Sequence, residues 1–290
     1  MKFSKLQATG NDFILVDART TEEEWSKLAR AMCDRHFGIG ADGLILVQDS
    51  TIADLEMRIF NSDGSEAEIS GNGLRCFVRY AIDVGLIRNI SSRIEQGHCS
   101  LTVDTLSGVR KAEAYMSEDR IARIEINMGL PQFQPEQIPV NAEVDIIPIL
   151  GYPLMINGKN LTLALLSMGN PHAVTFISEP TADFHLATIG SKVESHPIFP
   201  RRTNFEVARV LSREKIEARV WERGVGETLA CGSGACAIAV AAQLLDYVEP
   251  QVDIMLKGGT LSVYWDRLGD VLLTGPVEEV FTGEWLGETN

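Results

Sequence analysis

Short runs of apolar and β-branched residues, interrupted by glycine, asparagine, aspartate or proline, make up most of the chain. Such runs predict β-strands, and they cover Phe13–Val16, Leu44–Val47, Leu55–Phe60, Arg123–Ile126, Ala173–Ile177, Lys215–Trp221 and Val271–Leu273. Helical spacing of apolar residues is found in Thr21–Met32, Leu74–Val84 and Ala235–Asp246, with Thr20 or Thr21 as a suitable cap for the first. Many strands with few helices between them favour an α+β fold over alternating parallel β–α units.

The chain contains an internal repeat. Gly64–Gly73 (GSEAEISGNG) aligns with Val225–Gly234 (VGETLACGSG) at an offset of 231 − 70 = 161 residues, and each copy precedes a predicted helix. Upstream, Thr9–Phe13 aligns with Met168–His172 at a similar offset, 170 − 11 = 159. Two signals in the same order predict two similar halves. We expect Pro131–Pro153, which contains five prolines, to link them.

Each copy of the repeat places a small polar side chain directly before a glycine-rich helix start. The first amides of a helix lack partners within the helix and bind anions such as a carboxylate. Taken alone, Ser70 is most simply a helix N-cap and Cys231 a small buried residue. If the two halves face each other, however, both helix starts would hold one amino acid carboxylate, with its Cα between the two side chains. We also expect the positive helix end to favour the thiolate of Cys231, so that it can move an α-proton.

Seven motifs lie in order along nearly the whole chain. They are Thr9–Phe13 (TGNDF), Gly38–Gly43 (GIGADG), Phe60–Glu66 (FNSDGSE), Gly71–Cys76 (GNGLRC), Gly169–His172 (GNPH), Glu222–Gly224 (ERG) and Gly226–Gly234 (GETLACGSG). Together they resemble the diaminopimelate epimerase family, within the broader proline racemase-like superfamily. The resemblance implies two pseudo-symmetric domains, each a curved, mostly antiparallel β-sheet wrapped around a central α-helix. It also implies that the last residues rejoin the first domain, so that the domains are 1–118 with 276–290, and 119–275.

The resemblance further implies a cofactor-independent enzyme that inverts one α-carbon and interconverts LL- and meso-2,6-diaminopimelate, in lysine and peptidoglycan biosynthesis. The catalytic positions would be Ser70 and Cys231, assisted by His172 and Glu222. The reacting carboxylate would be held at Gly71, Asn72, Gly232 and Ser233. The rest of the pocket would be lined by Asn11, Asn61, Asn170, Asn204, Glu222 and Arg223. A guanidinium can fork onto a carboxylate, while amides and a glutamate can satisfy an ammonium.

Ser70 departs from the family pattern, which has a cysteine at this position. An alcohol has a far higher pKa than the roughly 8.5 of a free thiol, so Ser70 is expected to be a poor base at neutral pH. Three interpretations remain: a variant engineered to be inactive, a natural enzyme with a changed acid/base pair, or a relative with one-base chemistry such as β-elimination. The alternatives to diaminopimelate epimerisation are thus a related amino acid racemase, a one-base dehydratase, or a catalytically weak amino acid-binding protein. Because the residues for the distal end of the substrate match, we favour a diaminopimelate-binding protein with weakened or altered catalysis.

Composition narrows the expected partners. The 290 residues are 45% hydrophobic, enough to bury one large core or two smaller ones. Their 26 basic and 40 acidic residues give a net charge of 26 − 40 = −14, which disfavours nucleic acid and anionic membranes as partners. No signal peptide or long apolar span is evident, and five irregularly spaced cysteines fit a reducing compartment, so we expect a cytoplasmic protein. The expected partner is a small amino acid, with neither metal nor pyridoxal phosphate, and the resemblance allows a homodimer.

Overall fold

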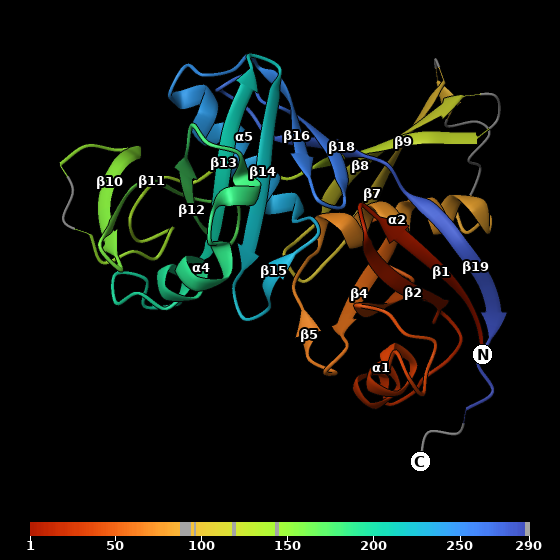
Figure 1. Cartoon of the computed structure of the whole chain (residues 1–290). Coiled ribbons are helices and arrows are strands. Elements are labelled where there is room, and N and C mark those ends of the chain that lie inside the picture. Colours follow the sequence, from red (N-terminus) through yellow and green to blue (C-terminus); the bar gives the residue numbers. More distant parts are fainter. Residues whose placement is uncertain (88–93, 96, 118–119, 143–144, 288–290) are drawn as a thin grey trace. The chain divides into compact units, whose positions relative to one another are not determined.

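The computed structural model describes residues 1–87, 94–95, 97–117, 120–142 and 145–287. The chain divides into two compact units, which we call unit 1 (Met1–Asn127 with Thr274–Asn290) and unit 2 (Met128–Leu273). Each unit is a curved β-sheet around one central helix, α2 in unit 1 and α5 in unit 2 (Figure 1).

Unit 1 is built from an early run of strands and one strand from the end of the chain. The strands are β1 (Lys2–Ala8), β2 (Asn11–Asp17), β3 (Gly43–Gln48), β4 (Leu55–Asn61), β5 (Glu66–Ala67), β6 (Ile94–Glu95), β7 (His98–Asp104), β8 (Arg110–Ser117), β9 (Arg120–Asn127) and β19 (Glu278–Glu284). Pairing gives the order β19-β1-β2-β3-β4-β7-β8-β9, in which β2–β3 and β4–β7 are parallel and the other pairs antiparallel. Helix α2 (Gly71–Asp83) contacts β1, β2, β3, β4, β8 and β9, and α1 (Trp25–Cys33) packs on β3 and β4.

Unit 2 repeats this plan. Its strands are β10 (Ile149–Ile156), β11 (Lys159–Ser167), β12 (Pro171–Phe176), β13 (Asn204–Ser212), β14 (Lys215–Glu222), β15 (Gly226–Thr228), β16 (Gln251–Leu256) and β17 (Gly259–Tyr264), and β18 (Leu272–Gly275) crosses the boundary between the units. The order is β10-β11-β12-β13-β14-β16-β17, with β12–β13 and β14–β16 parallel. Helix α5 (Gly232–Leu244) contacts β11, β12, β13, β16 and β17, whereas α4 (Leu186–Glu194), preceded by the short helix η1 (Thr181–Asp183), packs on β13, β14 and β15.

The repeat extends to the strand register. In the parallel pairs, Phe13 lies opposite Gly43 in unit 1, and His172 lies opposite Asn204 in unit 2. The offsets, 172 − 13 = 159 and 204 − 43 = 161, are those of the sequence repeat. The central helices are both 13 residues long and begin 232 − 71 = 161 residues apart. The predicted α+β fold of two pseudo-symmetric halves is thereby confirmed.

The composition of the central helices explains how a sheet can enclose them. Helix α5 is buried on nearly every side from Gly232 to Gln243, and seven of its 13 residues are glycine or alanine. A helix that is apolar all round requires cover on all faces, and small side chains let strands approach it closely. A strongly curved sheet meets both requirements.

All three predicted helix starts differ from the sequence-based expectation, and α5 begins at Gly232, three residues before the predicted Ala235. Helix α1 begins at Trp25 with Glu24 as its N-cap residue and without a side-chain cap hydrogen bond, so neither Thr20 nor Thr21 caps it. Helix α2 begins three residues before Leu74, because its glycines form the first helical turn rather than a turn before the helix. Local propensity disfavours glycine in a helix, but the Ser70 cap and the surrounding sheet fix this turn.

The region from β9 onward also differs. Arg120–Asn127, expected in the second domain, pairs with β8 and therefore lies in unit 1. Pro131–Pro153, expected to link the halves, lies within unit 2, where Ile138, Val140 and Ile149 belong to the hydrophobic core. The prolines interrupt regular structure here without keeping the segment out of the core. No helix in the described part of the chain is long and apolar enough to cross a bilayer.

Candidate functional site

The start of α2 is capped by the side chain of Ser70. Its backbone is extended (φ −140°, ψ 122°), and its Oγ accepts a hydrogen bond from Gly73 N at 3.0 Å. Asn72 is the second residue of α2, and its Nδ2 donates to Asn11 Oδ1 at 3.3 Å. Asn11 Nδ2 in turn donates to Asp42 Oδ2 at 2.6 Å. These contacts bring Ser70, the first turn of α2 and the start of β2 into one cluster, which we call the unit 1 cap.

The start of α5 is capped in the same way by Cys231. Its backbone has nearly the same conformation (φ −127°, ψ 119°), and its Sγ accepts a hydrogen bond from Gly234 N at 3.4 Å. The same Sγ lies 3.5 Å from Ser233 Oγ, which accepts a hydrogen bond from Asn170 Nδ2 at 3.3 Å. We call this cluster the unit 2 cap. The sequence repeat has therefore placed Ser70 and Cys231 in equivalent positions of their own units.

The environment of Cys231 does not favour its thiolate. Burial raises the pKa of the Cys231 thiol well above its ordinary value, and Glu222 raises it further. The hydrogen bond with Ser233 lowers this pKa, Glu206 raises it and the Gly234 amide lowers it, but these effects leave it high. The expectation that the helix N-terminus makes Cys231 a thiolate is wrong for this state, because burial outweighs the cap. Cys231 is a neutral thiol, the form that gives a proton.

His172 lies beside the unit 2 cap and is fully buried. Its Nδ1 is 2.7 Å from Glu206 Oε1, and its Nε2 is 2.9 Å from Asn170 Oδ1. Glu206 is also fully buried, which raises the pKa of its carboxyl; the contact with His172 lowers this pKa and Glu222 raises it. The imidazole is therefore held between a carboxyl group and the amide of Asn170, which in turn donates to Ser233 beside the thiol.

Sequence reasoning did not single out Glu206. It lies in β13 between Phe205 and Val207, which both point into the core of unit 2, so it faces the other side of the sheet. There its Oε1 lies 3.1 Å from the position that a Cβ on Gly234 would occupy. The available signal was the repeat itself, since 206 − 161 = 45 and residue 45 is isoleucine. A carboxylate at the repeat position of an apolar residue marks a place where the two halves differ in chemistry.

Glu222 ends β14, and Arg223 begins the turn after it. Asn204 Oδ1 accepts a hydrogen bond from Arg223 N at 2.9 Å, and Asn204 Nδ2 donates to Pro171 O at 2.9 Å. Glu222 Oε1 accepts from Thr228 Oγ1 at 2.5 Å. The Asn204 amide thus fixes the backbone of β12 and of the Arg223 turn, while the Arg223 side chain is exposed.

Apart from Asn61, the predicted site residues gather within each unit. Unit 1 brings together Ser70, Gly71, Asn72 and Asn11, whereas Asn61 is exposed at the end of β4 and donates to Ser65 Oγ at 3.0 Å. Unit 2 connects its predicted residues through the contacts already given; they are Asn170, His172, Asn204, Glu222, Arg223, Cys231, Gly232 and Ser233.

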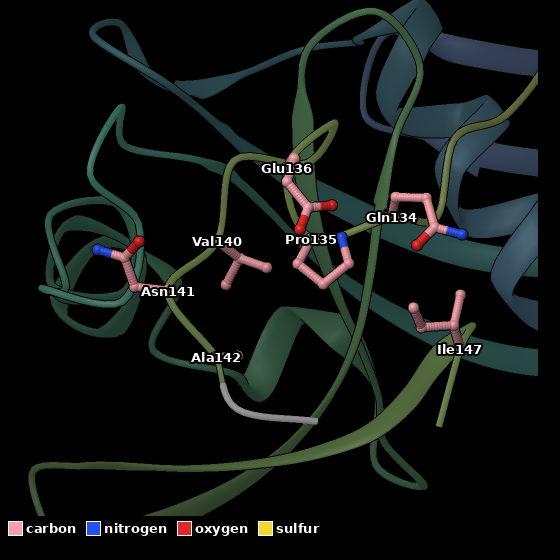
Figure 2. A pocket seen from close by; sticks show the side chains of 7 residues that line it. All are labelled: Gln134, Pro135, Glu136, Val140, Asn141, Ala142 and Ile147. Atoms are coloured by element: carbon pink, nitrogen blue, oxygen red, sulfur yellow. The ribbon is translucent and has the colours of Figure 1, made fainter. Parts of the chain in front are cut away.

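A surface hollow of about 600 Å³ lies elsewhere in unit 2. Figure 2 shows its lining, which consists of Gln134, Pro135, Glu136, Val140, Asn141, Ala142 and Ile147. None of these is a predicted site residue. In the described part of the chain, no group of three or more histidine, cysteine, aspartate or glutamate side chains is placed to hold a metal ion.

Comparison with solved structures gives the fold. The chain is similar to a hydroxyproline epimerase from Agrobacterium vitis, with a TM-score of 0.70 and 14% identity over 98% of this chain and 91% of the other. It is also similar to a phenazine biosynthesis protein from Bacillus anthracis, with a TM-score of 0.65 and 18% identity over 99% of both chains.

Comparison of sequences gives the family. The family model described as "Diaminopimelate epimerase" matches residues 3–134 and 164–280. The diaminopimelate epimerase of Moorella thermoacetica is 45% identical, and that of Pelotomaculum thermopropionicum 44% identical, each over 98% of this chain and 99% of the relative. With identity of this extent along nearly the whole length, the chain belongs to the diaminopimelate epimerase family.

Proposed function

We propose that the protein epimerises LL-2,6-diaminopimelate to meso-2,6-diaminopimelate by acid/base chemistry that needs no cofactor. The observation that carries the proposal is the pair of equivalent helix caps, Ser70 and Cys231, in a chain of this family. Each cap combines a proton-bearing side chain with amides at a helix start, the groups required to move an α-proton beside a bound carboxylate.

In the proposed reaction, the substrate carboxylate is held at Gly71, Asn72, Gly232 and Ser233. In this proposal Ser70 acts on one face of the α-carbon and Cys231 on the other. A base on one face takes the α-proton, and the electron pair left on the carbon is stabilised by delocalisation into the carboxylate, which the helix amides bind. The group on the other face returns a proton, so that the configuration inverts and no net proton is consumed. The neutral thiol of Cys231 is suited to giving this proton.

The distal amino acid end of the substrate would be read by the remaining polar residues. We assign this role to Asn11, Asn61, Asn170, Asn204, Glu222 and Arg223. The exposed guanidinium of Arg223 can bind a carboxylate in a bidentate manner. Asn204 contributes by fixing the backbone at Arg223, because its side-chain oxygen and nitrogen both hydrogen-bond to the main chain. We also propose, on the family resemblance, that the enzyme is cytoplasmic and forms a homodimer. Sedimentation velocity tests the homodimer.

Ser70 limits the reaction. Its hydroxyl is a much weaker acid than a thiol, so the oxygen base is scarce at neutral pH. We expect Cys231 to exchange the α-hydrogen on its own face with solvent slowly, through the small fraction of the protein in which its thiol is ionised, while complete inversion is slower still. Ser70→Cys should raise the epimerisation rate by about 10²–10⁴-fold, the contribution typical of a positioned acid/base group.

The test is to incubate the parental protein and Ser70→Cys with each diaminopimelate stereoisomer in D₂O. Chiral chromatography measures inversion, and mass spectrometry measures deuterium uptake. Equal and rapid exchange on both faces would show that Ser70 is a full catalytic partner. Binding without exchange in either protein would overturn the epimerase proposal and favour an amino acid-binding protein. Exchange of proline, hydroxyproline or histidine instead would favour a related racemase.

A further inference from the structure

A continuous hydrogen-bond chain connects a buried carboxyl group to the Cys231 thiol. Glu206 Oε1 lies 2.7 Å from His172 Nδ1, and His172 Nε2 lies 2.9 Å from Asn170 Oδ1. Asn170 Nδ2 donates to Ser233 Oγ at 3.3 Å, and Ser233 Oγ lies 3.5 Å from Cys231 Sγ. All five residues belong to unit 2. The chain thus reaches the thiol from the interior of a single unit.

The chemistry of the amide fixes the direction of this chain. Asn170 Oδ1 can only accept, so His172 Nε2 must carry a hydrogen and donate it. The Ser233 hydroxyl accepts from the Asn170 amide, which leaves its own hydrogen free for the sulfur of Cys231. Together with the Gly234 amide, the hydroxyl therefore directs a second donor at Sγ, an arrangement that stabilises a thiolate when one forms.

Glu206 supports this arrangement from the other side of the ring, because it occupies Nδ1. A single proton lies between its Oε1 and His172 Nδ1, either as a carboxylic acid beside a neutral imidazole or as a carboxylate beside an imidazolium. In both forms Nε2 keeps its hydrogen and donates to Asn170. Without a partner at Nδ1, the neutral ring could instead carry its hydrogen there and lose the donor at Nε2.

Unit 1 shows that the fold itself does not require this pair. The repeat positions of His172 and Glu206 are Phe13 and Ile45, both buried. Ile45 Cδ1 lies 3.1 Å from the Cβ position of Gly73, just as Glu206 Oε1 lies 3.1 Å from that of Gly234. Burying a carboxyl group is costly, and an apolar residue fills the equivalent place. The pair therefore has a role in unit 2 other than packing.

We propose that Glu206 is a positioning residue: by holding His172, it fixes the direction of the hydrogen-bond chain that ends at Cys231. This role deepens the proposed epimerase function: any effect of Glu206 on turnover rests on that function. Its effect on the thiol is independent of any substrate, so the two proposals can fail separately.

The first experiment measures the alkylation rate of Cys231 by iodoacetamide against pH, with peptide mass spectrometry. Glu206→Ile copies unit 1, whereas Glu206→Gln can still donate to Nδ1 and keep the hydrogen on Nε2. We expect Glu206→Ile to raise the pH of half-maximal alkylation by about one unit, and Glu206→Gln to leave it unchanged or lower it. Cys33 and Cys76, whose pKa values burial raises to about 12, are internal standards of slow reaction.

The direction of the shift decides the outcome. If Glu206 acted only through its charge, removing it would lower the pKa of Cys231, since the carboxylate raises that pKa. An unchanged or lowered midpoint in folded Glu206→Ile overturns the proposal. If Glu206→Ile does not fold, the double variant Glu206→Ile/His172→Phe reproduces the apolar pair of unit 1. It should raise the midpoint equally, and an unchanged midpoint in it is also contrary to the proposal.

The second experiment measures deuterium uptake from D₂O into both diaminopimelate isomers. We expect Glu206→Ile to slow exchange by about 10–100-fold, as loss of a positioning partner does at other sites, and Glu206→Gln to stay within about threefold. Equal slowing in both variants would assign the effect to charge and contradict the positioning role. If the parental protein exchanges neither isomer, the epimerase proposal fails, and the alkylation profile still decides the role of Glu206.

Discussion

Replacing Ser70 by alanine separates its structural role from its chemical one. The substitution removes the oxygen that accepts the Gly73 amide at 3.0 Å. Loss of an N-cap acceptor typically costs about 1 kcal/mol, within a range of about 0.5–2 kcal/mol. Helix α2 is the central helix of unit 1, whose strands surround it, so this cost should appear in the unfolding of the whole unit.

The magnitude can be measured by thermal unfolding. Unit 1 has 127 + 17 = 144 residues, for which about 1 kcal/mol corresponds to a fall in Tm of about 4 °C. Ser70→Asp is the matched control, because aspartate is as good an N-cap as serine and should keep Tm within about 1 °C of the parental value. Deuterium exchange of diaminopimelate measures the chemical role in the same three proteins.

Two results would refute this reasoning. An unchanged Tm in Ser70→Ala would mean that the Gly73 amide is satisfied without Ser70. An unchanged rate of deuterium exchange on both faces of the substrate in Ser70→Ala would mean that Ser70 is only a cap and takes no part in proton transfer. We expect Ser70→Asp to keep the parental Tm but to exchange the α-hydrogen of diaminopimelate at a rate different from that of the parental protein.

Two further predictions concern unit 2 and its counterpart in unit 1. Gly234→Ala should destabilise the protein by about 1–3 kcal/mol in urea unfolding, because its Cβ would meet Glu206 Oε1 at 3.1 Å and disturb a buried hydrogen bond. Gly73→Ala meets a flexible methyl end at the same distance and should change stability by less than about 1 kcal/mol; equal losses would contradict this account. The hydrogen bonds from Arg219 hold the pKa of Glu227 below its ordinary range, so the stability from this pair is complete above about pH 4.3 and is lost as pH falls through the folded pKa. Glu227→Gln should therefore flatten the acid limb of unfolding free energy against pH, and a parallel profile would refute the assignment.

The repeat allowed much of the fold to be predicted from the sequence. Its offset located both central helices and both caps, because Ser70 and Cys231 precede glycine-rich starts that few other local structures explain. All seven predicted strands coincide with observed ones. The strands that went unpredicted, such as β1 and β17, mix polar and apolar residues, since one of their faces is exposed. Period-two patterns of this kind are weak in strands of eight residues or fewer.

Chemistry inside the fold was harder to predict. Glu206 is a lone carboxylate in a strand, a pattern that usually indicates a solvent-exposed position. Only the packing of β13 against α5 shows that it is buried beside His172. The state of Cys231 was mispredicted for the same reason: the sequence shows the helix start but not the burial and the two carboxyl groups that raise the pKa.

The two caps have similar geometry but differ in the buried charged group nearest to them: a guanidinium in unit 1 and a carboxyl group in unit 2. In unit 1, the fully buried guanidinium of Arg75 donates to Gly71 O at 3.3 Å and to Asn72 Oδ1 at 2.8 Å, next to the Ser70 cap. In unit 2, burial of the thiol and the carboxyl groups of Glu222 and Glu206 raise the pKa of Cys231. A nearby cation favours the deprotonated form of a side chain and a nearby carboxylate the protonated form. In the proposed reaction, inversion of the substrate α-carbon needs a base on one face and an acid on the other. These surroundings favour the base in unit 1 and the acid in unit 2. The pKa of a hydroxyl is too high for one nearby guanidinium to ionise it at neutral pH, whereas the pKa of a thiol is low enough. The cysteine in Ser70→Cys should therefore titrate below Cys231, and this difference is the physical reason to expect that variant to gain activity.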